Sequence, residues 1–173
     1  LEQDKYGIKV LDSSDGYIVK LFRRKRLFSS ALFRPYYARF VENSKSLKKL
    51  GFHSVVVENV SYCKPIKRAL VFYQPIPGQT LRSVLQSQIA SEGLMKRFIA
   101  LFAELHDKGV LFRSIHLNNV IYTDAYQPLG LIDIADMKIR AKSLPPKARV
   151  RNFRHLTRYK IDQESIKRFG VDR

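Results

Sequence analysis

The sequence predicts an α+β fold in two compact lobes, a small antiparallel sheet with one helix followed by a larger, mainly helical lobe. Three observations predict it. Residues 6–22, "YGIKVLDSSDGYIVKLF", alternate apolar and polar side chains around a turn-forming "SSDG", which is typical of a β-hairpin. Residues 33–50 carry apolar side chains at helical spacing. The breaker cluster "PIPGQ" at 75–79 precedes helical patterns, so we expect lobes at 1–75 and 76–173.

The remaining elements follow from the same rules. The segments "FHSVVVENV" and "RALVFYQPI" predict two further strands, which would complete a sheet of about four strands packed on one helix. In the second lobe, "TLRSVLQSQI" predicts a short helix with Thr80 as its candidate N-cap. The segment "SEGLMKRFIALFAELHDKG" predicts a long amphipathic helix that ends at Gly109. Two short strands, "NNVIYT" and "LGLIDIA", follow, and the tail is expected to form one or two helices.

The chain is strongly basic, with 32 Lys and Arg against 15 Asp and Glu among 173 residues, a net charge of +17. Such a field attracts nucleic acid, anionic lipid headgroups, phosphorylated glycans or nucleotides, although solvated surface charge also serves solubility. Residues 137–173 are the most basic part, with 12 Lys and Arg against 3 acidic residues. Four arginines there either meet a phosphorylated sugar or an anionic membrane surface, or form a solvated helix face: Arg149, Arg151, Arg154 and Arg158.

The composition also excludes several classes of protein. A hydrophobic content of 45% argues against a disordered chain. Cys63 is the only cysteine, so no intramolecular disulfide can form and a reducing compartment is expected. The longest apolar runs are strand-sized, well short of the roughly 20 residues that span a bilayer, and no signal peptide is expected. We therefore expect a cytoplasmic protein whose charge allows a place at the inner face of the membrane.

Five features follow one another in an order that suits phosphoryl transfer. Lys20 lies in the strand "YIVKLF", Glu42 lies on the next helix, and the Pro/Gly hinge follows. After the helix that ends in "LHDKG" come a loop with Asn119 and a strand end with Asp133. A strand lysine can pair with the inner phosphates of a nucleotide, and a helix glutamate can hold that lysine in place. Asn119 and Asp133, fourteen positions apart across a small hairpin, offer the oxygen ligands that Mg²⁺ prefers.

These motifs resemble the protein-kinase-like fold over nearly the whole chain. The segment "LHDKGVLFRSIHLNNVIY" is similar to the kinase catalytic loop, with Arg113 at the motif arginine, Ser114 at the catalytic aspartate and Asn119 at the metal-binding asparagine. The segment "LIDIA" resembles the strand end that carries the metal aspartate, here Asp133. The segment "SIHLNN" also resembles the loop of small-molecule kinases such as the aminoglycoside and choline kinases, with His116 at the motif histidine.

A narrower resemblance is to the bacterial lipopolysaccharide core heptose/Kdo kinases and their toluene-tolerance relatives. It rests on "VKLFRRKR", "ENSKSLKKLGF", "YQPIPGQTL" and "IDIADMKIR", the last followed by a basic segment. The resemblance implies transfer of phosphate from ATP, with Mg²⁺, to a sugar hydroxyl of lipopolysaccharide core or a related small molecule. Nucleotide and a phosphorylated glycan would be the partners. The implied site residues are Arg113, Ser114 and His116 for catalysis, Lys20, Glu42 and Tyr73 for the nucleotide, and Asn119 and Asp133 for the metal.

The chain departs from the kinase pattern in ways that leave its activity open. Ser114 is no base at neutral pH, although the loose transition state of phosphoryl transfer asks little of a base. His116 and Asp136 are the candidates to take over that role. A glycine-rich phosphate loop is absent near the start of the sequence, and Ile134-Ala135 replaces Phe-Gly. Three functions therefore remain: a phosphotransferase, a pseudokinase that senses nucleotide or scaffolds a partner, and, with less support, an RNA-associated kinase-like protein.

Overall fold

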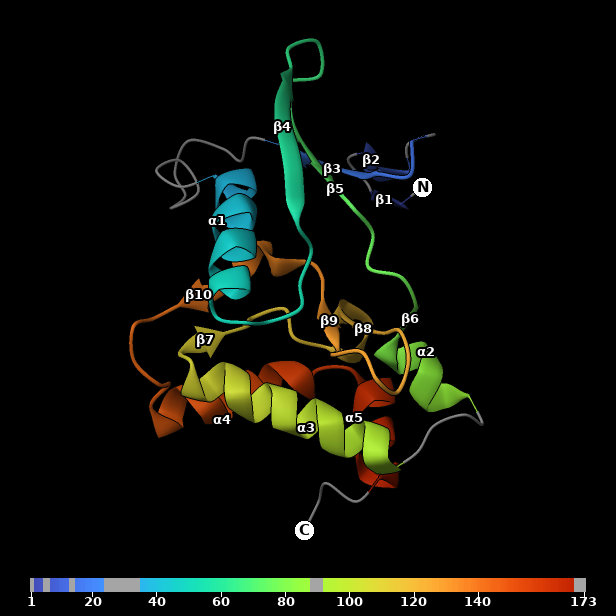
Figure 1. The fold of residues 1–173 in the computed structure, drawn as a ribbon, viewed down its shortest axis with the longest axis vertical. Coiled ribbons are helices and arrows are strands. Elements are labelled where there is room, and N and C mark those ends of the chain that lie inside the picture. Colours follow the sequence, from blue (N-terminus) through green and yellow to red (C-terminus); the bar gives the residue numbers. More distant parts are fainter. Residues whose placement is uncertain (1, 5–6, 13–14, 24–34, 88–91, 170–173) are drawn as a thin grey trace.

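The computed structural model describes residues 2–4, 7–12, 15–23, 35–87 and 92–169 (Figure 1). Its first part is a five-stranded antiparallel sheet in the order β1-β2-β3-β5-β4. The strands are β1 (Glu2–Asp4), β2 (Gly7–Asp12), β3 (Ile18–Arg23), β4 (Val57–Cys63) and β5 (Arg68–Tyr73). Parts of the predicted hairpin turn, of the basic run and of the first helix, at 13–14, 24–26 and 33–34, lie outside the described residues.

Helix α1 (Tyr36–Lys49) packs beside this sheet through one apolar face (Figure 1). Phe40 and Leu47 on that face are fully buried. The ring of Phe40 contacts Phe22 of β3 and Tyr73 of β5, with centroids 5.6 and 5.5 Å apart. Burial of side chains of this size contributes about 1.5–3 kcal/mol each, which holds α1 firmly on the sheet.

The second part of the chain is mainly helical, with α3, α4 and α5 gathered at the opposite end of the molecule from the β4–β5 tip (Figure 1). Its longer elements are α2 (Leu81–Gln86), α3 (Glu92–Asp107), α4 (Pro146–Leu156) and α5 (Lys160–Arg168). Its short elements are β6 (Gln79–Thr80), β7 (Val110–Leu111), η1 (Leu117–Asn119), β8 (Val120–Tyr122), β9 (Gly130–Leu131), η2 (Ile134–Asp136) and β10 (Lys138–Ile139). Thr80 caps α2 as predicted, because its Oγ1 accepts a hydrogen bond from Ser83 N at 3.2 Å.

Two small sheets bring distant segments together under the first part of the chain. Strands β6, β8 and β9 form one sheet, and β7 pairs with β10 in the other. The residues after α1 join the first of these sheets, because Ser54 bridges Leu131 of β9. The observed order, a small antiparallel sheet with one helix followed by a helical region, is the predicted α+β class. Among the helices in the described ranges, none has the length and apolar character that crossing a bilayer would require.

Candidate active site

An ion pair joins the first part of the chain to the second at the centre of the site. Lys20 of β3 places its Nζ atom 2.6 Å from Oδ1 of Asp133. The lysine side chain is 18% exposed and the aspartate 47% exposed, so the pair lies at the edge of solvent. The lysine amine also lies 5.6 Å from the ring centroid of Phe40, which adds a favourable cation–π contact. Strand pairing with β5 on one side and β2 on the other fixes the position of Lys20.

The backbone of Asp133 has a special conformation. It follows β9 and precedes η2, with φ 52° and ψ 46°, in the left-handed region. Asp is among the few residues besides glycine that enter this region, at a cost of about 1–3 kcal/mol. Asn43 of α1 steadies the turn, because its Nδ2 donates to the carbonyl oxygens of Ile134 at 2.7 Å and Met137 at 3.3 Å. Helix α1 therefore positions the segment that carries the candidate metal aspartate.

Asn119 links the candidate catalytic loop to the strand that leads to Asp133. Its Nδ2 donates to the carbonyl oxygen of Ser114 at 2.8 Å, and its own carbonyl accepts from Ile132 N at 3.1 Å. The side chain is 6% exposed. Because the amide nitrogen is used inside the loop, the amide oxygen is the atom left for a metal. Lys20 is far from Asn119 and Asp133 in the sequence. The structure brings the three predicted site residues into one region.

Ser114 adjoins a carboxylate that the kinase pattern does not place there. Its Oγ lies 2.7 Å from Oδ1 of Asp136 and 3.2 Å from the carbonyl oxygen of Asp133, and its backbone N donates to the same Asp136 oxygen. Burial raises the pKa of the Asp136 carboxyl above its ordinary value. The hydrogen bond from Ser114 opposes this rise, and the negative charge of Asp133 adds to it. A partly buried carboxyl with a raised pKa is a candidate general base.

The start of the candidate catalytic loop is anchored by Asn152 of α4, which is 1% exposed. Its Nδ2 donates to Phe112 O, and its Oδ1 accepts from Phe112 N at 3.3 Å and from His106 Nε2 at 3.1 Å. Burial lowers the pKa of His106, which keeps the imidazole neutral, with its proton on the nitrogen that faces Asn152. One side chain therefore satisfies both backbone groups of the residue at the loop entrance.

The far end of the loop is anchored by Asp162 of α5, which is fully buried. Its two oxygens accept from Arg82 Nε at 2.8 Å and Arg82 Nη2 at 3.0 Å, and Oδ2 also accepts from Leu117 N at 3.3 Å. Arg82 further stacks on Tyr159, with its guanidinium carbon 5.3 Å from the ring centroid. The two parallel hydrogen bonds of this pair hold the end of the loop in place, so its role is structural.

His116 lies beside this anchor and not against Ser114. Its ring meets the Tyr159 ring edge-on, with centroids 5.4 Å apart. Its buried Nδ1 atom has no hydrogen-bond partner among the described residues. Burial lowers the pKa of His116, and the positive charge of Arg82 lowers it further. A neutral imidazole with one free nitrogen is chemically able to act as a base, and its catalytic role stays a prediction.

The structure also shows the surroundings of Glu42, Tyr73 and Arg113, whose roles stay predictions. Lys20 pairs with Asp133 rather than with Glu42, which is exposed on α1 and lines a basic pocket with Arg39. Tyr73 is 8% exposed, and its ring packs against the core. Arg113, at the motif arginine, is exposed and lines the same pocket as Glu42.

The anchors Asn43, Asn152 and Asp162 are not among the residues that the motif comparison selects. A signal for Asn43 exists, because it stands at helical spacing between Phe40 and Leu47 on the apolar face of its helix. An amide on such a face must find buried partners. Asn152 and Asp162 carry no comparable signal, since their neighbours in sequence are largely polar and basic.

The donor set fits a magnesium ion. Asp133 offers a carboxylate and Asn119 an amide oxygen, the hard ligands that Mg²⁺ prefers. Among the described residues, no group of three or more His, Cys, Asp or Glu side chains could hold a metal ion. Mg²⁺ needs no such cage, because it commonly binds through one or two carboxylates together with water and substrate phosphates. The residues therefore fit an ion that arrives with a nucleotide.

Comparison with known proteins supports the fold. No protein-family model and no curated protein sequence matches the chain. Among solved structures it is similar to WbdD, in a co-crystal structure with the kinase inhibitor LY294002. The TM-score is 0.50 and the sequence identity 19%, over 73% of this chain and 30% of the WbdD chain. This chain thus spans less than a third of that protein, and the likeness shows a kinase-like fold.

Proposed function

We propose that this chain is an ATP- and Mg²⁺-dependent phosphotransferase that acts on a sugar hydroxyl of lipopolysaccharide core or of a related small molecule. One observation carries the proposal. The Lys20–Asp133 pair, 2.6 Å apart, places a cation and a candidate metal ligand from the two parts of the chain at one point, close to the loop that holds Asn119. The kinase-like fold, found also in a protein that binds a kinase inhibitor, supports the same chemistry.

Each residue would have a separate task. Lys20 would leave Asp133 and bind phosphate oxygens of the nucleotide, as a compact point charge at the end of a fixed strand. Asp133 and Asn119 would hold the ion. A bound Mg²⁺ would neutralise the charge that develops on the transferred phosphoryl group. Asp136, which adjoins Ser114, would receive the proton of the acceptor hydroxyl directly. The cytoplasm supplies both ATP and Mg²⁺, so we place the reaction there.

The experiment is titration of the protein with ATP by calorimetry, with and without Mg²⁺. Asp133→Ala should abolish the Mg²⁺-dependent part of binding. Glu164→Ala is the matched control, because it removes an exposed carboxylate of α5 whose lysine partner, Lys160, is 3.9 Å away. Binding that ignores both Mg²⁺ and Asp133 would refute the proposed metal site. Absence of ATP binding to the wild-type protein would refute the function itself.

A pseudokinase is the second candidate, and Ser114 favours it. The hydroxyl is held by Asp136 and by the carbonyl of Asp133, and it is not a base. Such a protein would bind nucleotide and transfer nothing. Single-turnover measurements with radiolabelled ATP and a truncated lipopolysaccharide acceptor separate the two candidates. Mg²⁺-dependent ATP binding without transfer to any hydroxyl would favour the pseudokinase.

A further inference from the structure

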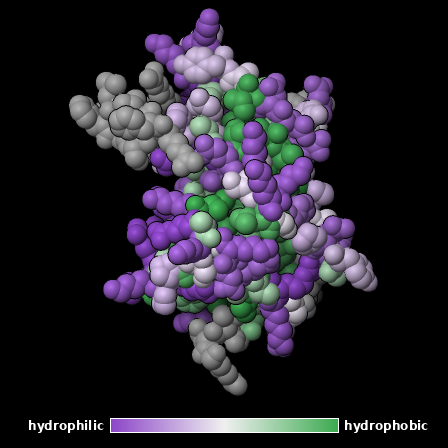
Figure 2. Space-filling model, turned by 60° about the vertical axis from the view of Figure 1, so that its left-hand side comes forward, coloured by the Kyte–Doolittle hydropathy of each residue, from purple (hydrophilic) through white to green (hydrophobic). Residues whose placement is uncertain are grey.

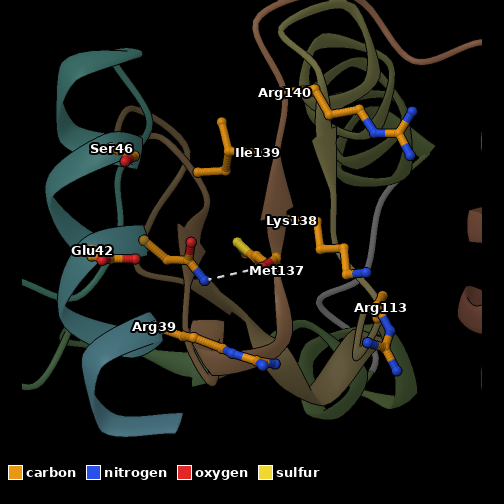
Figure 3. Close-up of a pocket in the computed structure, with 9 residues that line it drawn as sticks. Arg39, Glu42, Ser46, Arg113, Met137, Lys138, Ile139 and Arg140 are labelled. Carbon is orange, nitrogen blue, oxygen red and sulfur yellow. Dashed lines mark hydrogen bonds between the residues drawn. The ribbon is translucent and has the colours of Figure 1, made fainter. Parts of the chain in front are cut away.

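A polar pocket of about 580 Å³ lies between α1 and the segment that follows η2 (Figure 3). Its volume is within the range of small-molecule sites. The lining residues come from α1, from the catalytic loop and from the chain around β10: Arg39, Glu42, Asn43, Ser46, Arg113, Met137, Lys138, Ile139 and Arg140. The space-filling view shows that hydrophilic residues dominate the lower part of this side of the molecule (Figure 2). None of the contacts described for the Lys20–Asp133 pair uses this pocket.

Positive charge dominates the pocket. Four of its lining residues are Lys or Arg and one is Glu, a net charge of +3. Arg113, Lys138 and Arg140 are exposed, and none of the three side chains forms a hydrogen bond or ion pair with another described residue. Figure 3 shows Arg39, Arg113 and Lys138 on facing sides of the space. The four cations outnumber the single carboxylate and repel one another on balance, so such a site gains free energy when an anion enters.

The backbone under these cations is fixed before any ligand binds. Lys138 and Ile139 of β10 pair with Leu111 and Val110 of β7. Arg140 N donates to Gly109 O at 3.0 Å. On the other wall, Asn43 of α1 binds the carbonyl of Met137, as the dashed line in Figure 3 marks. A site with a fixed frame loses less entropy on binding, which favours a specific ligand over loose attraction of counterions.

The chemistry of the lining favours a phosphate group. Arginine guanidinium groups bind phosphate oxygens in pairs of parallel hydrogen bonds, and lysine adds a point charge. The volume exceeds that of a phosphate alone and leaves room for an attached sugar ring. The pocket also shares backbone with the candidate active site. Arg113 directly precedes Ser114, and Lys138 follows Asp136 by two residues.

We propose that this pocket, lined by Arg39, Arg113, Lys138 and Arg140, is a binding site for the phosphate monoester of a phosphorylated sugar. Phosphate binding in this pocket does not depend on the proposed function. Only the identification of the phosphorylated acceptor as the source of the phosphate rests on it. In that case the pocket holds a phosphate already present on the acceptor, while another hydroxyl of the same molecule is phosphorylated. Free inorganic phosphate, as an effector, is the other source of the same chemistry.

The test is calorimetric titration with inorganic phosphate, with a hexose 6-phosphate and with the unphosphorylated hexose, in the absence of nucleotide. Lys138→Ala/Arg140→Ala removes two exposed cations and should weaken both phosphate ligands by about tenfold or more. Lys160→Ala/Lys167→Ala is the matched control, because it removes two exposed cations from α5 and leaves the pocket intact. Thermal unfolding of both double variants verifies that each is folded. Equal weakening by the two double variants, or failure of the wild-type protein to bind either phosphate, would overturn the proposal.

The comparison of ligands identifies the source. Tighter binding of the hexose 6-phosphate than of inorganic phosphate assigns the pocket to the phosphorylated acceptor, whereas equal affinity assigns it to free phosphate. Binding of the plain hexose with equal affinity would show that the pocket does not read the phosphate and would refute the proposal. Asp133→Ala should leave phosphate binding unchanged. If the protein binds phosphate in this pocket but binds no ATP, the phosphate site is supported and the proposed phosphotransferase function is refuted.

Discussion

The hydroxyl of Ser114 lies 2.7 Å from Oδ1 of Asp136, so a carboxylate adjoins the position at which the kinase pattern places one. The carboxylate comes from η2, on the other side of the site, rather than from the catalytic loop itself. Burial raises its pKa, which brings it closer to the range in which a carboxylate accepts a proton at neutral pH. The base that the sequence lacks at position 114 thus has a structural substitute 22 residues away.

Placing an aspartate at position 114, where the kinase pattern has one, tests whether Asp136 takes its place in this protein. Ser114→Asp should lower the free energy of unfolding by about 1–3 kcal/mol at neutral pH, because it places a second carboxylate against Asp136. Ser114→Asp/Asp136→Asn should recover most of that loss and keep one carboxylate in the site. Urea unfolding of the wild type, Ser114→Asp, Asp136→Asn and the double variant gives the coupling energy. Additive effects of the two substitutions would show that the side chains do not interact.

Turnover of the same variants reports on function. If Asp136 acts as the base, Asp136→Asn alone should reduce transfer of phosphate by about a hundredfold or more, and Ser114→Ala should change it only modestly. The double variant with the restored aspartate should regain activity. A full rate in Asp136→Asn would contradict the role of this carboxylate.

The sequence predicts the fold and part of the site for a physical reason. Period-two and helical patterns, with the breaker cluster at 75–79, are local signals, and they correctly predict a small sheet with one helix before a helical region. The motif spacing also brings Asn119 and Asp133 to the same hairpin. The sequence names Asp136 as a candidate replacement for the base, but its hydrogen bond with Ser114 could not be predicted, because the left-handed turn at Asp133 lies between them in the chain. No pattern of neighbouring residues encodes such a turn.

Asn152 is expected to be the most sensitive polar residue outside the reacting groups. Asn152→Leu should lower the free energy of unfolding by about 3–5 kcal/mol, because it leaves the buried N–H and carbonyl groups of Phe112 and the imidazole of His106 without partners. Asn59→Ala is the control, since Asn59 is exposed on β4 and should change stability by less than about 0.5 kcal/mol. Similar losses in both variants would refute the anchoring role of Asn152.

The buried imidazole of His106 predicts a dependence of stability on pH. Its pKa in the folded protein lies below the ordinary value of 6.5, so the unfolded chain binds the proton more tightly. Neutral His106 therefore adds to the stability of the fold above pH 6.5. This stability is lost as the pH falls below 6.5 toward the lower pKa of the folded state. His106→Gln keeps a donor for Asn152 without a titrating group, and should flatten the decline between neutral and weakly acidic pH. Urea unfolding across this range measures the slope, and an unchanged slope would contradict the prediction.

The buried pair of Arg82 and Asp162 should behave differently when one partner is removed and when both are. Asp162→Asn leaves the Arg82 guanidinium without its counter-charge beside the loop, and should cost about 3–5 kcal/mol of stability. Arg82→Met/Asp162→Leu removes both charges from a packed site, and should cost less than the single change, because desolvation of the two ions offsets much of their attraction. Only the hydrogen bond from Leu117 N to Asp162 would then remain unmade. Unfolding measurements on the wild type, Arg82→Met, Asp162→Leu and their double variant close a thermodynamic cycle and give the coupling energy. A double variant less stable than Asp162→Asn would show that the pair stabilises the fold in its own right, beyond neutralising a buried charge.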